Sequence, residues 1–388
     1  MQSYFEKKNQ TEKVASETTS NLHKFGTGLL KELAGRFEGE NLIFSPCSIV
    51  CAMAILYGGS EGDTRQEFEK VFGFDGLDQV GREYRKLINH TLSIGDSKSV
   101  NLANGLWIDK SLADGLRDDF VNRAVEDFST SIYPSDFSSP TLPDEVNAWV
   151  ENATQGRIKN LVNDLGGTNS LVANALYFAG KWNASFIAND TVDDRFDTIV
   201  DGVVPCRMMN AEGWRDYIET ENSQIVFLGY STGANPTCMA ICLPKSDRTL
   251  ADSLGDLEQI HVHRAAAKQS RLHLQMPRFK IGFKVCLNEA LNSLGMVQAF
   301  DEDAAKFDLF CPGFFIGKVI HQASLEVDEE GSVAAAATAI MMFGGGMPPH
   351  LKIEPIVMRV DKPFLLAILD NTISSTLFAG AVINPSKD

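Results

Sequence analysis

Helical patterning dominates the first half of the chain. Apolar positions recur at helical spacing in four segments, residues 21–37, 63–72, 116–128 and 144–161. Residues 46–57 are apolar almost all round and end at Gly58-Gly59, so this helix is expected to be buried. Asp144 comes just before the apolar positions of its helix, where an N-cap is expected.

Strand patterns become frequent after residue 100. Apolar runs of strand length, typical of strands buried in a large sheet, occupy residues 99–108, 170–179 and 237–243. Beyond residue 350 the chain has strand patterns only, at residues 353–360, 364–370 and 375–382. The last two are expected to form a hairpin around Asn371-Thr372. Helices first and strands later, without strict alternation, predict the α+β class.

The composition is that of an ordinary globular chain. Of 388 residues, 44% are hydrophobic and 22% are charged, which is typical of folded proteins rather than disordered or fibrous ones. We find no linker rich in Pro, Gly or Ser, no internal repeat and no low-complexity block. One large domain over residues 21–388 is therefore expected, with residues 1–20 as a mobile extension that leads into the first helix.

The segment 329–346 is the most informative of the chain. It reads Glu-Glu-Gly-Ser-Val-Ala-Ala-Ala-Ala-Thr-Ala-Ile-Met-Met-Phe-Gly-Gly-Gly and follows a strand-like stretch at residues 324–328. Its small side chains expose little apolar surface in a loop and add no bulk to a crowded sheet. It is therefore a candidate conformational switch. The alternative is an Ala-rich helix flanked by a Gly-rich loop, because Ala is the best helix former.

The charge disfavours polyanionic partners. A formal net charge of −16 repels phosphate backbones and acidic lipid surfaces. Nucleic acid and heparin-like partners are therefore not expected. The basic residues Arg82, Arg85 and Lys86 are interpreted as a solvated helix face rather than a polyanion site.

The chain carries no visible targeting or spanning segment. No uncharged apolar run approaches the ~18 residues that a membrane span needs. The first 20 residues are polar and lack the apolar core of a signal peptide, so the chain is leaderless or its numbering starts after processing. Triplets of the type Asn-x-Ser/Thr, which accept glycans only in a secreted protein, begin at Asn9, Asn89, Asn152, Asn183 and Asn189.

Metal, cofactor and enzyme chemistry have no support in the motifs. Most of the seven cysteines are interpreted as small buried hydrophobes. No Cys-x-x-Cys or His-x-x-x-His spacing occurs, so no metal site is expected. The sequence also lacks Gly-x-Ser-x-Gly, a phosphate loop and a dinucleotide fingerprint. We therefore expect neither a cofactor nor an enzyme.

Short blocks in a fixed order make the chain resemble the serpin family. Among them are Asn41-Leu42-Ile43-Phe44-Ser45-Pro46, Asn147-Ala148-Trp149, Asn174-Ala175-Leu176-Tyr177-Phe178, Pro277-Arg278-Phe279, His321-Gln322-Ala323 and Asp361-Lys362-Pro363-Phe364. The resemblance covers about residues 20–388, and it depends on the number, order and spacing of the blocks. It implies an α+β fold with three β-sheets, about nine helices and an exposed reactive-centre loop at about residues 329–350.

The resemblance also implies a function. Inhibitory serpins are suicide substrates: a serine protease attacks the exposed loop and forms an acyl-enzyme. The cut loop then inserts into the main sheet as a new strand and carries the protease to the far pole. For this chain the strand would run over about 14 residues, 332–345, and span about 45 Å. The intact sheet is expected to hold a potential gap with unused hydrogen-bonding capacity.

The loop hinge has the residue types that insertion needs. The resemblance assigns to it Glu329, Glu330, Gly331, Ser332, Val333, Ala334, Ala335, Ala336 and Ala337. At a period of two, Ser332, Ala334 and Ala336 would point into the sheet and the alternate residues outward. Val333 departs from the acidic residue that inhibitory relatives often have, but valine is a good strand former. Gly331 supplies flexibility.

The position of the cleaved bond is predicted from the family spacing. Counting from Glu329 places it at Gly345–Gly346, with Pro348-Pro349 just after it. Phe343 or Met342 is the alternative, because either side chain would suit a chymotrypsin- or elastase-like pocket. No Arg or Lys lies nearby, so proteases whose pocket requires a cation are disfavoured.

Further residues match places where the family controls opening of the main sheet. Ser45, Ser48, Asn174 and His321 match a polar cluster beneath it, called the shutter. Trp182, together with an ion pair between Arg278 and Glu329, matches the breach, where insertion begins. Hydrogen bonds in the shutter would hold the strands closed and release them on insertion.

Two functions follow from the resemblance. We expect an inhibitor that forms a covalent complex with a chymotrypsin- or elastase-like serine protease and is itself a monomer. The rival is a non-inhibitory serpin that acts as a carrier or chaperone, whose hinge typically has bulky, charged or Pro residues. Because most targets of the family are extracellular, an extracellular or cell-surface protein is expected, with a leaderless cytoplasmic form as the alternative.

Overall fold

The computed structural model describes the backbone of residues 2–94, 100–128, 130–231, 236–332 and 354–387, and the side chains of the same residues apart from 2–16 and 125–128. The helices are α1 (Gln2–Arg36), α2 (Pro46–Gly59), α3 (Gly62–Phe72), α4 (Leu77–Leu92), α5 (Asp118–Phe128), α6 (Leu142–Ala153), α7 (Leu254–Glu258), α8 (Ile260–Ala266) and α9 (Asn288–Leu294). These nine α-helices of the described residues agree with the number expected.

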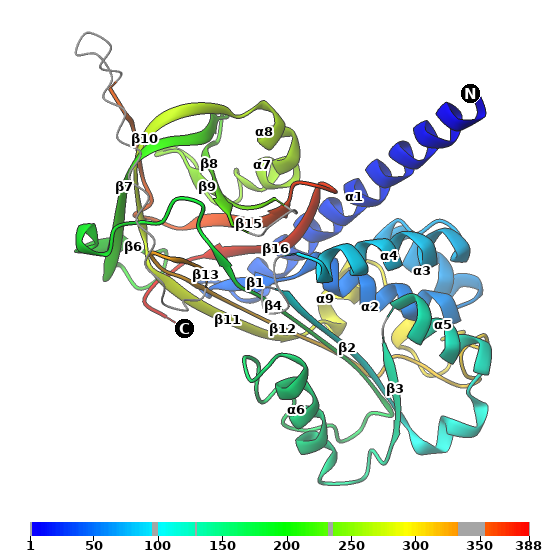
Figure 1. The fold of residues 1–388 in the computed structure, drawn as a ribbon. Helices are drawn as coiled ribbons and strands as arrows, with labels where there is room; N and C mark the ends of the chain where they lie inside the picture. The colour runs from blue at the N-terminus through cyan, green and yellow to red at the C-terminus, as the bar shows by residue number, and fades with distance from the viewer. Residues whose placement is uncertain (1, 95–99, 129, 232–235, 333–353, 388) are drawn as a thin grey trace.

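A seven-stranded sheet, the main sheet, runs through the middle of the molecule (Figure 1). Its strands are β2 (Val100–Asp109), β3 (Ser131–Ser135), β4 (Ser170–Phe178), β5 (Gly180–Lys181), β11 (Phe279–Cys286), β12 (Lys318–Val327) and β13 (Gly331–Ser332). The long strands follow the order β3-β2-β4-β12-β11, and β4 and β12 are parallel neighbours. The short β13 and β5 extend the sheet at one end of β12.

A second, nine-stranded network contains β1 (Leu42–Phe44), β6 (Val192–Asp197), β7 (Val203–Glu219), β8 (Ser223–Tyr230), β9 (Thr237–Pro244), β10 (Lys268–Pro277), β14 (Ile356–Arg359), β15 (Phe364–Asp370) and β16 (Ser375–Val382). Three sheets were expected, and the described strands form two hydrogen-bonded networks. The reason is β7, whose 17 residues pair with β8 at one end, with β6 at the other and with β10 along most of the length. The single strand β7 thereby connects two groups of strands, which would form two separate sheets if each group had a strand of its own in place of β7.

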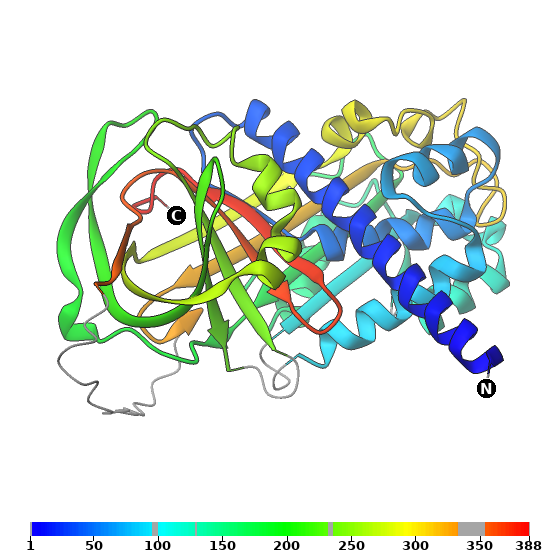
Figure 2. The same cartoon turned by 90° about the horizontal axis from the view of Figure 1, so that it is seen from above.

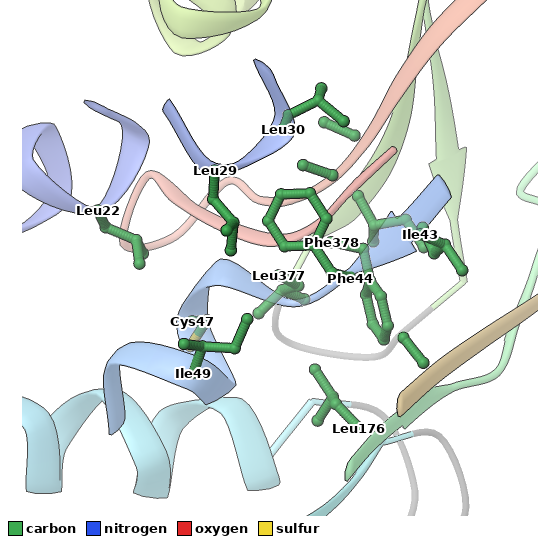
Figure 3. Packing of buried hydrophobic residues seen from close by; sticks show 14 of the residues in the cluster. Leu22, Leu29, Leu30, Ile43, Phe44, Cys47, Ile49, Leu176, Leu377 and Phe378 are labelled. Atoms are coloured by element: carbon green, nitrogen blue, oxygen red, sulfur yellow. The ribbon is translucent and has the colours of Figure 1, made fainter. Parts of the chain in front are cut away.

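The largest core lies where the two networks meet α1 and α2. Leu29 and Leu30 of α1 lie over Leu377 and Phe378 of β16, next to Phe44 of β1 (Figure 3). A smaller core joins α6 to the opposite face of the main sheet, through residues such as Val146, Val150, Leu171 and Trp107. The main sheet is therefore covered on both faces, and any strand added to it would enter between packed layers.

Most expected elements are present, and their differences have local causes. The helix expected at 144–161 ends at Ala153, because Gln155, Gly156 and Asn160 have positive φ, which stops a right-handed helix. Asp144 is not its N-cap: the cap is Thr141, and Asp144 lies in the first turn. At the N-terminus the expected extension is itself helical, since α1 begins at Gln2 and projects beyond the helices around it (Figures 1 and 2).

Candidate functional site

The hinge begins where β12 ends. After Val327 the chain reverses in a tight turn, in which the Asp328 carboxylate accepts hydrogen bonds from the backbone N–H groups of Glu330 (2.9 Å) and Gly331 (3.1 Å). The backbone N–H of Asp328 donates to the carbonyl of Gly331 at 2.9 Å. The turn therefore aims the following residues back along β12, antiparallel to it, as β13.

The short strand β5 clamps β13 from the other side. Gly331 pairs with Lys181, and Ser332 pairs with Gly180. A Cβ atom on Gly331 would lie 2.1 Å from the carbonyl oxygen of Gly180, so only glycine allows this approach. Gly331 and Ser332 of the hinge are thus fixed between β5 and the end of β12.

Trp182 connects the hinge to the core. Its indole Nε1–H donates to the carbonyl of Asp328 (2.9 Å), and its backbone N–H donates to the carbonyl of Glu330 (2.9 Å). The indole stacks on Tyr230 with ring centroids 4.5 Å apart. The hydroxyl of Tyr230 lies 2.7 Å from that of Ser332, and both side chains are buried. Ser332 therefore has a specific polar partner inside the fold.

The expected ion pair is present but is only one of three contacts of Glu329. One oxygen of its carboxylate lies 3.5 Å from Nε of Arg278, whose side chain is 46% exposed. The other oxygen accepts a hydrogen bond from the hydroxyl of Thr191 at 2.6 Å. The backbone carbonyl of Glu329 accepts from the N–H of Phe186. Exposed ion pairs contribute little to stability. The hydrogen bonds from Thr191 and from the backbone of Phe186 therefore hold Glu329 in place more than the ion pair does.

The four residues expected at the shutter do lie together. Asn174 of β4 and His321 of β12 are direct partners in the parallel ladder, and their side chains are hydrogen-bonded. The hydroxyl of Ser48 donates to the Asn174 side-chain oxygen at 2.8 Å, and the N–H of Ser45 donates to Nε2 of His321 at 3.1 Å. The N-terminal end of α2 is thereby tied to both strands of the pair.

The bonds of His321 define its protonation state. Nε2 must accept from the backbone of Ser45, and Nδ1 must donate to the carbonyl oxygen of Asn174. Only the neutral imidazole with its proton on Nδ1 does both. The side chain is fully buried, and this burial lowers the pKa of His321 to about 3.

The main sheet is closed beneath the hinge. Strands β4 and β12 pair from Leu171↔Lys318 to Tyr177↔Ser324, which is seven consecutive register pairs. No open gap separates them, so the potential gap expected from the sequence would form only when these two strands part. An inserting strand would have to break this ladder, but it would then pair with both β4 and β12. Insertion would exchange one ladder for two, and it would therefore increase backbone hydrogen bonding without a pre-existing gap.

Several predicted site residues lie outside the described residues. These are Val333, Ala334, Ala335, Ala336 and Ala337 of the hinge, and Met342, Phe343, Gly345 and Gly346 around the cleaved bond. The described residues contain no cluster of three or more His, Cys, Asp or Glu side chains arranged to hold a metal ion. None of their helices is long and apolar enough to cross a membrane.

The sequence did not single out three residues that complete the site. The amide of Asn174 also donates to the side-chain oxygen of Asn104, its cross-strand partner in β2. Tyr230 and Thr191 hold Ser332 and Glu329. Only the register of strands distant in sequence brings these groups together, so no local pattern could have found Tyr230 or Thr191. Asn104 lies in a polar interruption of an apolar run, which was a usable signal.

A family model described as serpin (serine protease inhibitor) matches residues 20–385. The chain belongs to the serpin family. This is a family of protease inhibitors rather than enzymes. This serpin is 30% identical to antithrombin-III of Mus musculus, in an alignment that covers 93% of this chain and 80% of the relative. It is 29% identical to leukocyte elastase inhibitor A of Rattus norvegicus, covering 93% of this chain and 97% of that one.

A solved structure supports the same assignment. An Arabidopsis serpin in its native stressed conformation superimposes with a TM-score of 0.84 at 25% identity, over 96% of this chain and 99% of that one. The mixed α+β serpin fold expected from the sequence is thereby confirmed. Here β4 and β12 are direct neighbours, so no additional strand lies between them in the described residues.

Proposed function

We propose that this serpin is a suicide-substrate inhibitor of chymotrypsin- or elastase-like serine proteases. The observation that carries the proposal is the state of the hinge. Gly331 and Ser332 already lie antiparallel to β12 at the end of the seam between β4 and β12, and Ser332 is fully buried. The residues that follow, Val333 to Ala339, are small, so they could extend β13 into that seam without steric conflict.

The chemistry is that of an interrupted proteolysis. The serine oxygen of the protease attacks the carbonyl carbon of Gly345 and forms an ester. The peptide bond to Gly346 breaks, and the protease histidine delivers a proton to the leaving amine. Insertion of the freed hinge segment then carries the ester-linked protease away from its starting position, so that water does not complete the hydrolysis.

The choice of protease class rests on the residues before the proposed bond. Met342 and Phe343 are apolar, and the segment 329–350 contains no Arg or Lys. A pocket that binds a cation would gain nothing here, whereas an apolar pocket has Phe343 or Met342 within two or three residues. That a relative is named as an inhibitor of leukocyte elastase agrees with this choice.

Incubation with chymotrypsin and with pancreatic elastase tests the proposal. We expect a covalent complex that survives denaturing electrophoresis, and a released peptide that begins Gly346-Met347-Pro348. A peptide that begins at Gly344 would move the bond to Phe343 and keep the mechanism. Cleavage without any stable complex with either enzyme would contradict inhibition and favour the carrier or chaperone role.

A pair of hinge variants tests insertion itself. Ala334 is predicted to point into the sheet and Ala335 outward, so Ala334→Arg should block insertion while Ala335→Arg should not. We expect Ala334→Arg to be cleaved at the same bond and to release active protease, with the stoichiometry of inhibition raised at least about tenfold, because a buried unpaired charge is costly. Equal inhibition by the two variants would contradict the predicted register.

A further inference from the structure

A cavity of about 260 Å³ lies beside the breach. Most of its walls come from β7, β8, β9 and α8, which lie together at one end of the molecule (Figure 1), and from the chain that follows β5; Gln269 of β10 and Asn371 after β15 complete the lining. Four aromatic side chains line it, Trp182, Phe186, Trp214 and Phe227. The first two and Phe227 are buried, but Trp214 is 46% exposed and forms part of the rim. The cavity thus has aromatic walls and also carries the charged side chains of Arg215, Asp216 and Arg264.

Arg215 lines this cavity and carries a positive charge that has no ion-pair partner among the described residues. Along β7 it shares its face with the buried Tyr217 and Met209, so its side chain points to the inner side of the sheet. Gly213 leaves room for it: a Cβ there would lie 3.0 Å from the Arg215 guanidinium. Within the described residues no carboxylate forms an ion pair with Arg215, and its one hydrogen bond goes to the carbonyl of Trp214.

A second guanidinium lies in the same wall. Arg264 of α8 pairs with Asp216 at 2.9 Å and stacks over the ring of Phe227, 5.3 Å from its centroid. Its Nε is buried and finds no acceptor among the described residues. The lining therefore has two cations for one carboxylate, in a protein whose net charge is −16. Burial lowers the pKa of Arg215, as expected where the charge lacks a partner.

We propose that this cavity binds a small organic anion. A body of one or two rings packs against the aromatic lining, and its carboxylate or sulfonate accepts hydrogen bonds from Arg215 and Arg264. At about 260 Å³ the cavity is slightly smaller than the ~300 Å³ at which ligand pockets in proteins usually begin, and like them it places charged and polar groups beside aromatic side chains. A guanidinium forms paired hydrogen bonds with such an anion.

The occupant would share a wall with the loop hinge. Trp182 lines the cavity, and the same indole donates to the Asp328 carbonyl in the turn before β13. Asn183, the next residue of the lining, is held through its N–H to the carbonyl of Gly229. A ligand that immobilises Trp182 therefore also immobilises the segment to which the hinge is bound.

Two fluorescent probes of the same shape test the proposal with the full chain. One is anilinonaphthalene sulfonate, and the other is the uncharged phenylnaphthylamine, which lacks the sulfonate. We expect the sulfonate to bind at one saturable site and to quench tryptophan emission by energy transfer from Trp182 and Trp214. Arg215→Leu should weaken its affinity about tenfold or more, because a hydrogen bond to a charged group is lost. The uncharged probe should bind Arg215→Leu at least as well as the unaltered protein.

Arg195→Leu is the matched control, because it removes the same charge from an exposed position in β6 away from the cavity. It should bind both probes like the unaltered protein. If Arg215→Leu does not fold, Trp214→Ala replaces it: this rim residue is half-exposed, and its loss should weaken both probes. The proposal is wrong if binding is not saturable, if Arg215→Leu and Arg195→Leu behave alike, or if Trp214→Ala binds both probes normally.

Discussion

His321 joins three segments that are far apart in the sequence. It pairs with Asn174 across the β4–β12 seam and accepts a hydrogen bond from Ser45 at the start of α2. Because one ring nitrogen donates and the other accepts, a second proton would remove the acceptor and place a charge in a fully buried site. The shutter is thus stable only while this single imidazole is neutral.

Acid should therefore weaken the fold through His321. Its pKa is lowered from 6.5 to about 3 in the folded protein, so the contribution is complete above about pH 6.5 and is lost as the pH falls toward 3. His23 and His261, whose pKa values burial lowers to about 4 and about 3, change stability in the same direction.

The variant His321→Gln isolates the shutter. Glutamine can accept from Ser45 and donate to Asn174, but it does not titrate. Below about pH 6 the free energy of unfolding of this variant should fall less steeply, by up to about 1.4 kcal/mol per pH unit. Urea unfolding at a series of pH values measures this slope. A slope equal to that of the unaltered protein would show that His321 is not protonated on unfolding.

At the scale of elements, β5 and β13 are two-residue strands that owe their position to their neighbours. β13 contacts β12 through one register pair and β5 through two. Neither strand could be stable alone. The turn at Asp328 and the indole of Trp182 hold them, and Gly331 allows the two backbones to approach.

Gly331→Ala should separate these two strands. The added Cβ would lie 2.1 Å from the Gly180 carbonyl oxygen, so we expect a loss of about 1–3 kcal/mol in stability. The breach should also open, which proteolysis within residues 328–332 would detect. Gly282→Ala in β11 is the control, because no atom lies within 4 Å of a Cβ at that position. Similar losses for both variants would refute a specific close approach.

The sequence predicted best those helices and strands that are buried along their whole length. The expected segments 46–57, 364–370 and 375–382 agree closely with α2, β15 and β16, which are buried almost throughout. The long strand β7 was not predicted, because it alternates irregularly between buried and exposed positions as its partners change. The end of α6 was missed because apolar positions continue as far as Leu161, although Gly156 and Asn160 are residue types that often adopt a positive φ.

The residues of the candidate site likewise fall into those that were predicted and those that were missed. Family resemblance anticipated the four shutter residues, Trp182 and the Arg278–Glu329 pair, and the structure brings each group together. It did not anticipate that Thr191 and Tyr230 hold the hinge. The cavity beside Arg215 was also missed, because its lining comes from β7, β8, β9 and α8, which only the folded chain brings together.

At the scale of the whole molecule, the account depends on the topology of one seam. β4 and β12 are parallel, and β13 turns back antiparallel to β12. A longer β13 would therefore run antiparallel to both strands and would pair with each after they part. The closed form has one hydrogen-bonded ladder, between β4 and β12. The inserted form would have two, one on each side of the longer β13. The proposed function therefore requires that the native fold is not the most stable arrangement of its own strands.

Thermal unfolding of the intact protein, compared with protein whose reactive-centre loop has been cut by a protease that it does not trap, tests this claim most directly. We predict that the cut protein unfolds at a clearly higher temperature, because the hinge segment has entered the seam and doubled its ladder. Cut Ala334→Arg serves as the control and should gain much less. Coincident unfolding curves for the intact and the cut protein would contradict the account.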